Sequence, residues 1–258
     1  MESIGIIQYL IVCPFVFLSG FVDAIAGGGG LISLPAYLMI GLPSHTAIAT
    51  NKLSSAMGTT ISTVKYARNG YVNWKSGIFC IIFALCGSWT GASIALLIPE
   101  NVFSIVMIVL LPFIAFYVLK NKSFETDKEP YSERKTLILC VVIAFAIGMY
   151  DGFYGPGTGT FLLIFLTAVA RIPLNEAAGT TKIINLTSNA TALAVFLING
   201  KSMILLGITA GLFSIAGNYI GARLFTKNGA KIARPITIGV ITLLFIKIIV
   251  ELITGRAG

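Results

Sequence analysis

Apolar residues follow one another along most of this chain in long runs, separated by short polar or glycine-rich stretches. The runs cover residues 4–26, 76–98, 102–119, 137–149 and beyond, 203–222 and 235–253. Most of them approach the roughly 20 residues that an α-helix needs to cross about 30 Å of hydrocarbon. The pattern therefore predicts an all-α polytopic membrane protein.

Two glycine-rich breaks interrupt this pattern, and each follows an aspartate inside an apolar stretch. The first break is Gly27–Gly30, after Asp23, and the second is Gly155–Gly159, after Asp151. A short apolar piece follows each break, and residues 31–40 would form a helix only about 15 Å long. Irregular backbone at membrane depth persists where it is buried in protein or lines a wet cavity, so the breaks predict a functional cavity.

The two breaks belong to an internal repeat that covers most of the chain. Asp23 and Asp151 are 128 residues apart, and further along the spacing becomes 130. At that spacing the sequence pairs Thr50 with Thr180, Lys52 with Lys182, Asn69 with Asn199, Gly70 with Gly200, Gly77 with Gly207, Gly87 with Gly217 and Gly91 with Gly221. Such agreement at one spacing indicates duplication. We therefore predict an N-terminal membrane repeat at 1–119, a charged linker at 120–135 and a C-terminal membrane repeat at 136–258.

The distribution of lysine and arginine indicates how the two repeats are oriented. If the short pieces after the glycines cross the membrane, each half has five segments, and 13 of the 18 basic residues lie on one side. If the short pieces re-enter instead, each half has four spans, and the basic residues divide 10 to 5. The positive-inside rule favours the first count. We therefore predict two inverted repeats of about five transmembrane segments each, with a cytoplasmic linker and both termini outside.

The composition narrows the class of protein further. Charged residues make up 11% of the chain, against about 25% in a typical soluble domain. The net charge of +8 comes from basic residues in a few loops, which the positive-inside rule explains without a nucleic-acid partner. Four separated cysteines, which we expect to be buried apolar residues, and a single histidine give no reason to expect a metal or another cofactor. The chain has no nucleotide-binding loop, so we do not expect ATP to drive it directly.

We expect both breaks to form part of one substrate site. The residues whose backbone would face it are Gly27, Gly28, Gly29 and Gly30 in the first half and Gly155, Gly157 and Thr158 in the second. A helix that begins after each break would aim the positive end of its dipole at the cavity, which favours an anion. Inverted-repeat transporters build their sites from such broken helices. The alternative is that glycines only permit close helix packing, which is our interpretation of isolated ones such as Gly87 and Gly91.

Two lysines inside apolar segments also fit an anion. With the hydroxyl or amide residues that precede them, they form the triplets Thr50, Asn51 and Lys52 and Thr180, Thr181 and Lys182. Charged residues at membrane depth usually face a cavity or a partner, and charged or polar donors suit an anion with several oxygens. The alternative is that each lysine extends its charged end to the membrane surface.

Polar residues continue along the helices that follow the lysines. Ser55 in the first half corresponds to Asn185 in the second, and Asn189 lies one helical turn further on. We count Ser55, Asn185 and Asn189 among the candidate substrate-binding residues, because such a stripe can line a pathway. The alternative is hydrogen bonding between helices, which these residue types commonly provide in membranes.

Together, the repeated element of an aspartate and glycines, the triplets at 50–52 and 180–182, the chain length and the central charged linker resemble the TauE/SafE sulfite exporter family. The resemblance covers essentially the whole chain. It implies a secondary transporter of small sulfur-containing anions, such as sulfite or organosulfonates, in the cytoplasmic (inner) membrane. The expected partners are then a small anion and the lipid bilayer; whether the protein forms a homo-oligomer is left open.

Asp23 and Asp151 are candidates for proton coupling. A carboxylate beside an anion site repels the substrate while it is ionised, whereas burial and a nearby anion both favour the neutral carboxyl. Binding a proton together with the anion would then couple the two. The alternative is structural, with each carboxylate accepting hydrogen bonds from freed backbone N–H groups. A passive anion channel, and a membrane assembly factor or enzyme without transport, are the other functions that the sequence leaves open.

Overall fold

The computed structural model describes residues 5–103, 105–106, 129–228, 231–232 and 235. Most of the segments expected at 102–119 and 235–253, and the first part of the linker expected at 120–135, lie outside the described residues. Within them the chain is helical and contains no strand, as the apolar runs predict.

The described helices follow the same order in both halves: one long, one short and two long. They are α1 (Ile6–Ala26), α2 (Gly30–Met39), α3 (Ser44–Arg68), α4 (Trp74–Leu97), α6 (Glu133–Phe153), α7 (Thr158–Ala168), α8 (Leu174–Ile198) and α9 (Ile204–Asn228). α1, α4, α6, α8 and α9 are long and apolar enough to cross a membrane. α3 is as long as α8 but less hydrophobic, and α2 and α7 have only 10 and 11 residues. The prediction of an all-helical, multi-pass membrane protein is confirmed.

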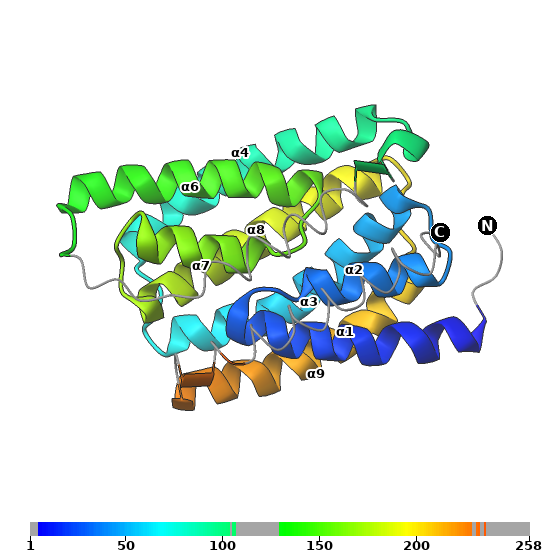
Figure 1. The fold of residues 1–258 in the computed structure, drawn as a ribbon, viewed down its shortest axis with the longest axis horizontal. Coiled ribbons are helices and arrows are strands. Elements are labelled where there is room, and N and C mark those ends of the chain that lie inside the picture. The colour runs from blue at the N-terminus through cyan, green and yellow to red at the C-terminus, as the bar shows by residue number, and fades with distance from the viewer. Residues whose placement is uncertain (1–4, 104, 107–128, 229–230, 233–234, 236–258) are drawn as a thin grey trace.

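The two halves interlock, because the first helix of each half packs along the fourth helix of the other. In Figure 1, α4 and α6 lie along the top and α1 and α9 along the bottom, with α3 and α8 between them. A Cβ atom at Gly91 would lie 1.9 Å from the carbonyl oxygen of Met149 on α6, and one at Gly217 would lie 2.1 Å from that of Phe17 on α1. Small residues let membrane helices approach this closely. The packing interpretation of isolated glycines such as Gly91 is therefore confirmed.

The first long helices of the two halves, α1 and α6, run in opposite directions. In Figure 1, α1 begins at the right-hand end and runs left, whereas α6 begins at the left-hand end and runs right. α2 and α7 each lead back toward the end at which the preceding long helix begins.

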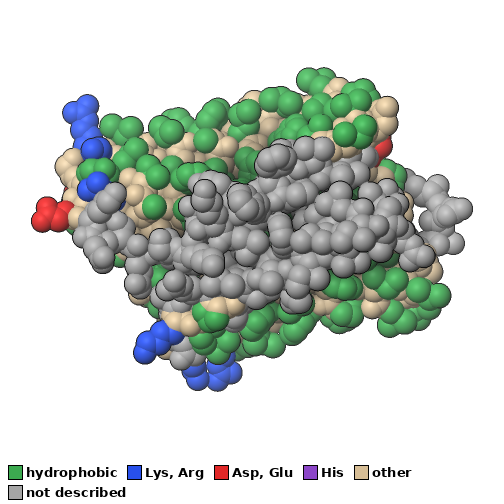
Figure 2. Space-filling view, in the orientation of Figure 1, with side chains coloured by type: hydrophobic (Ala, Val, Ile, Leu, Met, Phe, Trp, Pro, Cys, Tyr) green, Lys and Arg blue, Asp and Glu red, His purple; other side chains and the backbone are tan. Residues whose placement is uncertain are grey.

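Basic residues of several loops gather at one end, on the left in Figure 2. Lys75, at the start of α4, forms an exposed ion pair with Glu133, at the start of α6, with an N–O distance of 3.3 Å. Lys65, near the end of α3, lies over the ring of Tyr219 on α9. The start of α4, the end of α3 and the loops beside them therefore share this end of the molecule.

The outer faces of the helices carry large apolar side chains. On α4, Ile78, Phe79 and Ile82 are about half exposed, and hydrophobic side chains are spread along the upper and lower parts of the described surface in Figure 2. In a bilayer such residues contact lipid tails. Cys86 on the same helix is also exposed, so the expectation that all four cysteines are buried is wrong for this one, although it holds for the other three.

Candidate functional site

The two glycine breaks touch each other. α1 ends at Ala26, and the next residue, Gly27, has a left-handed φ of 76° and donates its N–H to the carbonyl oxygen of Asp23. α7 begins after Gly157, whose φ of 83° is also left-handed. A Cβ atom at Gly27 would lie 2.2 Å from the carbonyl carbon of Gly159. Gly27 is therefore required both for its backbone conformation and for its small size.

Two ion pairs cross between the halves beside these breaks. Asp23, near the end of α1, has its Oδ2 2.8 Å from Nζ of Lys182 on α8. Asp151, near the end of α6, has its Oδ1 2.8 Å from Nζ of Lys52 on α3. Three of these four side chains are at most 3% exposed, and that of Asp23 is 13% exposed. Each pair therefore compensates charges that would be costly to bury alone.

These contacts differ from those that two of the alternatives drawn from the sequence would give. Neither lysine extends to the membrane surface, because Lys52 and Lys182 are 1% and 2% exposed. Within the described residues, no backbone N–H group donates a hydrogen bond to the carboxylate of Asp23 or Asp151. Instead, each carboxylate forms an ion pair with a lysine of the opposite half.

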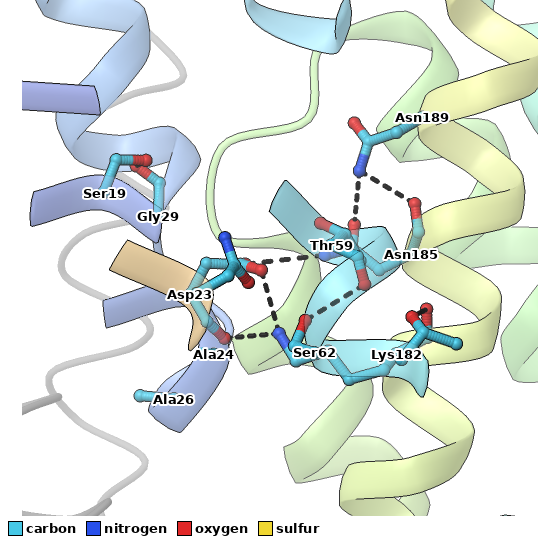
Figure 3. A network of polar contacts seen from close by, with 12 residues as sticks. Ser19, Asp23, Ala24, Ala26, Gly29, Thr59, Ser62, Lys182, Asn185 and Asn189 are labelled. Carbon is cyan, nitrogen blue, oxygen red and sulfur yellow. Dashed lines mark hydrogen bonds and ion pairs between the residues drawn. The ribbon is translucent and has the colours of Figure 1, made fainter. Parts of the chain in front are cut away.

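The Asp23–Lys182 pair belongs to a hydrogen-bonded network, which Figure 3 shows from close by. Lys182 also donates to the backbone carbonyl oxygen of Asp23. Nδ2 of Asn185 lies 3.5 Å from Oδ1 of Asp23, and Nδ2 of Asn189 donates to Oδ1 of Asn185 at 3.0 Å. We call these four residues the α8 network: Asp23 from α1 and Lys182, Asn185 and Asn189 from α8.

The Lys52–Asp151 pair has fewer partners. The hydroxyl oxygen of Thr158, the first residue of α7, lies 2.7 Å from Oδ1 of Asp151, the same oxygen that faces Lys52, and 2.6 Å from the carbonyl oxygen of Gly155. Oδ2 of Asp151 is buried without a hydrogen-bond partner among the described residues, and so is Oδ1 of Asn51. Buried polar atoms are normally hydrogen-bonded, so two unpartnered oxygens at one place indicate a functional site.

A small polar cavity lies against both ion pairs, and the centre of a water molecule can occupy about 20 Å³ of it. Most of the predicted site residues line it: Asp23, Gly27, Gly29, Gly30, Asn51, Lys52, Ser55, Asp151, Gly155, Thr158, Asn185 and Asn189. The structure therefore brings together residues from both breaks, from α3 and from α8. The wall suits a charged or polar solute, because its residues are glycines or carry polar side chains.

Some residues of the wall were not among the predicted site residues: Ser19, Gly20, Thr59, Gly159, Ser214 and Asn218. Ser214 and Asn218 are four residues apart on α9 and therefore share one face of that helix. In the sequence, two polar residues four positions apart inside an apolar run could have indicated that this face of the helix lines a polar site. Ser19 is one helical turn before Asp23 on α1, so it faces the same way.

Other predicted site residues lie behind the wall: Gly28, Thr50, Gly157, Thr180, Thr181 and Lys182. Lys182 does not line the cavity, but its ammonium group pairs with Asp23, which does. The hydroxyl of Thr50 accepts a hydrogen bond from the backbone N–H of Met203 at 3.1 Å, and so ties α3 to the start of α9. The hydroxyls of Thr180 and Thr181 are buried without a partner in the described part of the chain.

The fold and the cavity define a class: a polytopic membrane protein whose two similar halves enclose a small polar site with buried charges. The sequence model of the family "Sulfite exporter TauE/SafE" matches residues 12–248. The chain therefore belongs to this family, and the resemblance drawn from its motifs is confirmed.

Relatives over nearly the whole chain carry transporter names. The "Probable membrane transporter protein ORF9" of Sinorhizobium sp is 34% identical over 236 residues, which are 91% of this chain and 90% of that protein. The "Probable membrane transporter protein" of Haemophilus influenzae is 32% identical over 92% of each chain. YfcA of Escherichia coli K12, a "Probable membrane transporter protein", is 29% identical over 91% of this chain and 87% of its own. This protein is a membrane transporter of the TauE/SafE family. No solved structure matches it.

Proposed function

We propose that this transporter moves small sulfur-containing anions, such as sulfite or an organosulfonate, across the cytoplasmic membrane by secondary transport. The observation that carries the proposal is the two buried Asp–Lys pairs that cross between the halves at one polar cavity. The family description, which names sulfite, supports the substrate class, and the names of the relatives support transport without naming a substrate.

Groups that favour an anion converge on the cavity. α2 and α7 begin beside it, and the positive ends of their dipoles lie at its wall, at Gly29 and Gly30 for α2 and at Thr158 for α7. Lys52 adds an ammonium group to the same wall. Charge-assisted hydrogen bonds from such donors suit the three oxygens of a sulfite or sulfonate group.

The charge balance of the site supports proton coupling. Two lysines and two aspartates sum to zero, so a bound anion adds one uncompensated negative charge to a poorly hydrated cavity. Taking up one proton on Asp23 or Asp151 restores neutrality. The anion and the proton then favour each other's binding, and release of both on one side makes transport proton-driven.

For the architecture, we propose inverted repeats of about five segments each, with the basic end in the cytoplasm. The opposite directions of α1 and α6 and the matched order of the helices support this. The positive-inside rule supports the orientation. In such transporters one repeat moves as a rigid body against the other around a fixed site. In this protein the two ion pairs and the Gly27–Gly159 contact would connect the two repeats during that motion.

A passive channel is less well supported. Conduction through an open pore needs a continuous wet path, whereas Lys52 and Asp151 are buried at the point where the two halves meet. Two buried, paired charges at this junction favour a transporter that changes conformation over a permanently open pore.

Flux measurements on purified protein in lipid vesicles test the proposal. The panel is sulfite, thiosulfate, taurine, sulfoacetate, sulfate and small carboxylates. We expect saturable exchange of at least one sulfur oxyanion, and its loss in Lys52→Gln. Exchange of carboxylates alone would overturn the substrate class, and an absence of exchange for every solute would overturn small-anion transport.

A further inference from the structure

The two repeats place equivalent lysines in unequal surroundings. Lys182 donates to two acceptors of Asp23, the carboxylate Oδ2 and the backbone carbonyl oxygen. Within the described chain, Lys52 has one acceptor, Oδ1 of Asp151, although an ammonium group has three N–H donors. Lys52 is only 1% exposed, so its remaining donors are not turned toward bulk solvent.

The neighbours of the two lysines differ in the same way. Asn185 and Asn189 bond to each other and, through Asn185, to Asp23. By contrast, the side chains of Asn51 and Ser55 make no hydrogen bond to any described residue, and both line the cavity. Asn51 is 6% exposed and its Oδ1 is fully buried. We call Asn51, Lys52 and Ser55 the α3 group.

We infer that the anion binds to the α3 group, and that the α8 network is a fixed structural link rather than a second half-site. The inference rests on the proposed function and adds to it which of the two pseudo-equivalent sites takes the ligand. The α3 group has an ammonium, an amide and a hydroxyl that the protein itself leaves available, and all three can donate to oxyanion oxygens. More donors of the α8 network are already used, because Lys182 and the amide of Asn189 each have two acceptors, so a ligand there would compete with internal bonds.

The unpartnered Oδ2 of Asp151 fits the same assignment. An anion at Lys52 lies beside this carboxyl group, and two adjacent negative charges repel each other unless one is protonated. A proton on Oδ2 removes the repulsion and gives the buried oxygen a hydrogen to donate to the ligand. The other charged groups at the cavity, Asp23 on α1 and Lys182 on α8, neutralise each other. Asp151 is therefore the carboxyl group that lies beside the anion at Lys52.

The experiment compares matched variants that remove a whole ion pair, so that no charge is left buried alone. They are Lys52→Gln with Asp151→Asn, and Lys182→Gln with Asp23→Asn. The probe is methanesulfonate, whose charge stays constant over the pH range used, and sulfite is measured separately. Dissociation constants come from titration calorimetry of the purified full-length protein in detergent micelles. We expect the first double variant to lose about 10-fold or more in affinity and the second less than about 3-fold.

A second matched pair keeps the test decisive if a double variant does not fold. Ser55→Ala and Asn185→Ala change equivalent positions of the two repeats. We expect Ser55→Ala to weaken binding by about 2–10-fold and to leave the melting temperature of the unliganded protein unchanged. Asn185→Ala should lower that melting temperature and retain affinity. Calorimetry in buffers of different ionisation enthalpy should also show uptake of about one proton with methanesulfonate by wild type but not by Asp151→Asn.

Each outcome has a distinct meaning. Equal losses of affinity in both halves, or a greater loss in the Lys182 and Asn185 variants, would overturn the assignment to the α3 group while leaving anion transport intact. Proton uptake that persists in Asp151→Asn would overturn the role of that carboxyl. If wild type binds neither probe, the proposed substrate class fails and this inference fails with it.

Discussion

Removing either partner of the Asp23–Lys182 pair should destabilise the contact between the halves. Replacing Asp23 by Asn keeps the shape of the side chain but leaves the ammonium of Lys182, 3% exposed, without its counter-charge. Replacing Lys182 by Met leaves the carboxylate with the amide of Asn185 at 3.5 Å. Removing one partner of a buried pair costs about 3–5 kcal/mol. We take the lower value of about 3 kcal/mol for each variant, because Asp23 is 13% exposed.

The measurement is a double-mutant cycle on melting temperature in detergent. One kcal/mol corresponds to about 2–4 °C in a chain of this size, so each single variant should melt about 6–12 °C lower than wild type. The double variant buries no lone charge and should lose clearly less than the sum of the two single losses. Glu133→Gln is the matched control, because it breaks the Lys75–Glu133 pair, whose side chains are 85% and 93% exposed, and such pairs contribute little. Additive losses, or single losses no larger than that of Glu133→Gln, would refute the reasoning.

Three further predictions concern packing, pH and topology. Gly91→Ala should cost about 1–3 kcal/mol, measured as a lower melting temperature, because its Cβ atom would lie 1.9 Å from a carbonyl oxygen of α6; an unchanged value would contradict the close α4–α6 contact. Glu100 accepts hydrogen bonds from His45; burial alone would raise the pKa of Glu100, but the contacts with His45 outweigh it and lower this pKa. The melting temperature of Glu100→Gln should therefore lie below that of wild type at neutral pH, and the gap between the two should vanish as the pH falls through the lowered pKa of Glu100. A gap in melting temperature that does not change with pH would contradict this prediction. With cysteine introduced at Ser3 and Ser123, an impermeant reagent added to intact cells should label position 3 only; labelling of position 123 alone would reverse the orientation.

Much of the fold and part of the site can be predicted from the sequence. Hydrophobic run length predicts the long helices, and the spacing of 130 residues is enough to relate Lys52 to Lys182. The glycine breaks identify the ends of α1 and α6, because runs of glycine and proline cannot continue a helix. Charges at membrane depth are costly and rare, so each aspartate and lysine there is recognisable as a candidate.

The pairing of those charges cannot be predicted in the same way. A repeat shows which residues are equivalent, but not which residues of the two halves touch, and Asp23 and Lys182 are 159 positions apart. The unequal hydrogen bonding of Asn51 and Asn185 depends on how the helices of the two halves pack in space, which no sequence pattern carries. Thr50 shows the limit most clearly, because its place in the Thr-Asn-Lys triplet suggests a ligand contact, whereas its hydroxyl binds the backbone of Met203.

The central claim is that anion and proton cross together through the site between the two ion pairs. The most direct measurement is sulfur-anion exchange and net flux in vesicles with and without an imposed pH gradient, for wild type, Asp23→Asn and Asp151→Asn. We predict that wild type is accelerated by the gradient, and that Asp151→Asn keeps downhill exchange but loses the acceleration. Wild-type flux that is indifferent to the gradient, or full acceleration in both aspartate variants, would contradict the account.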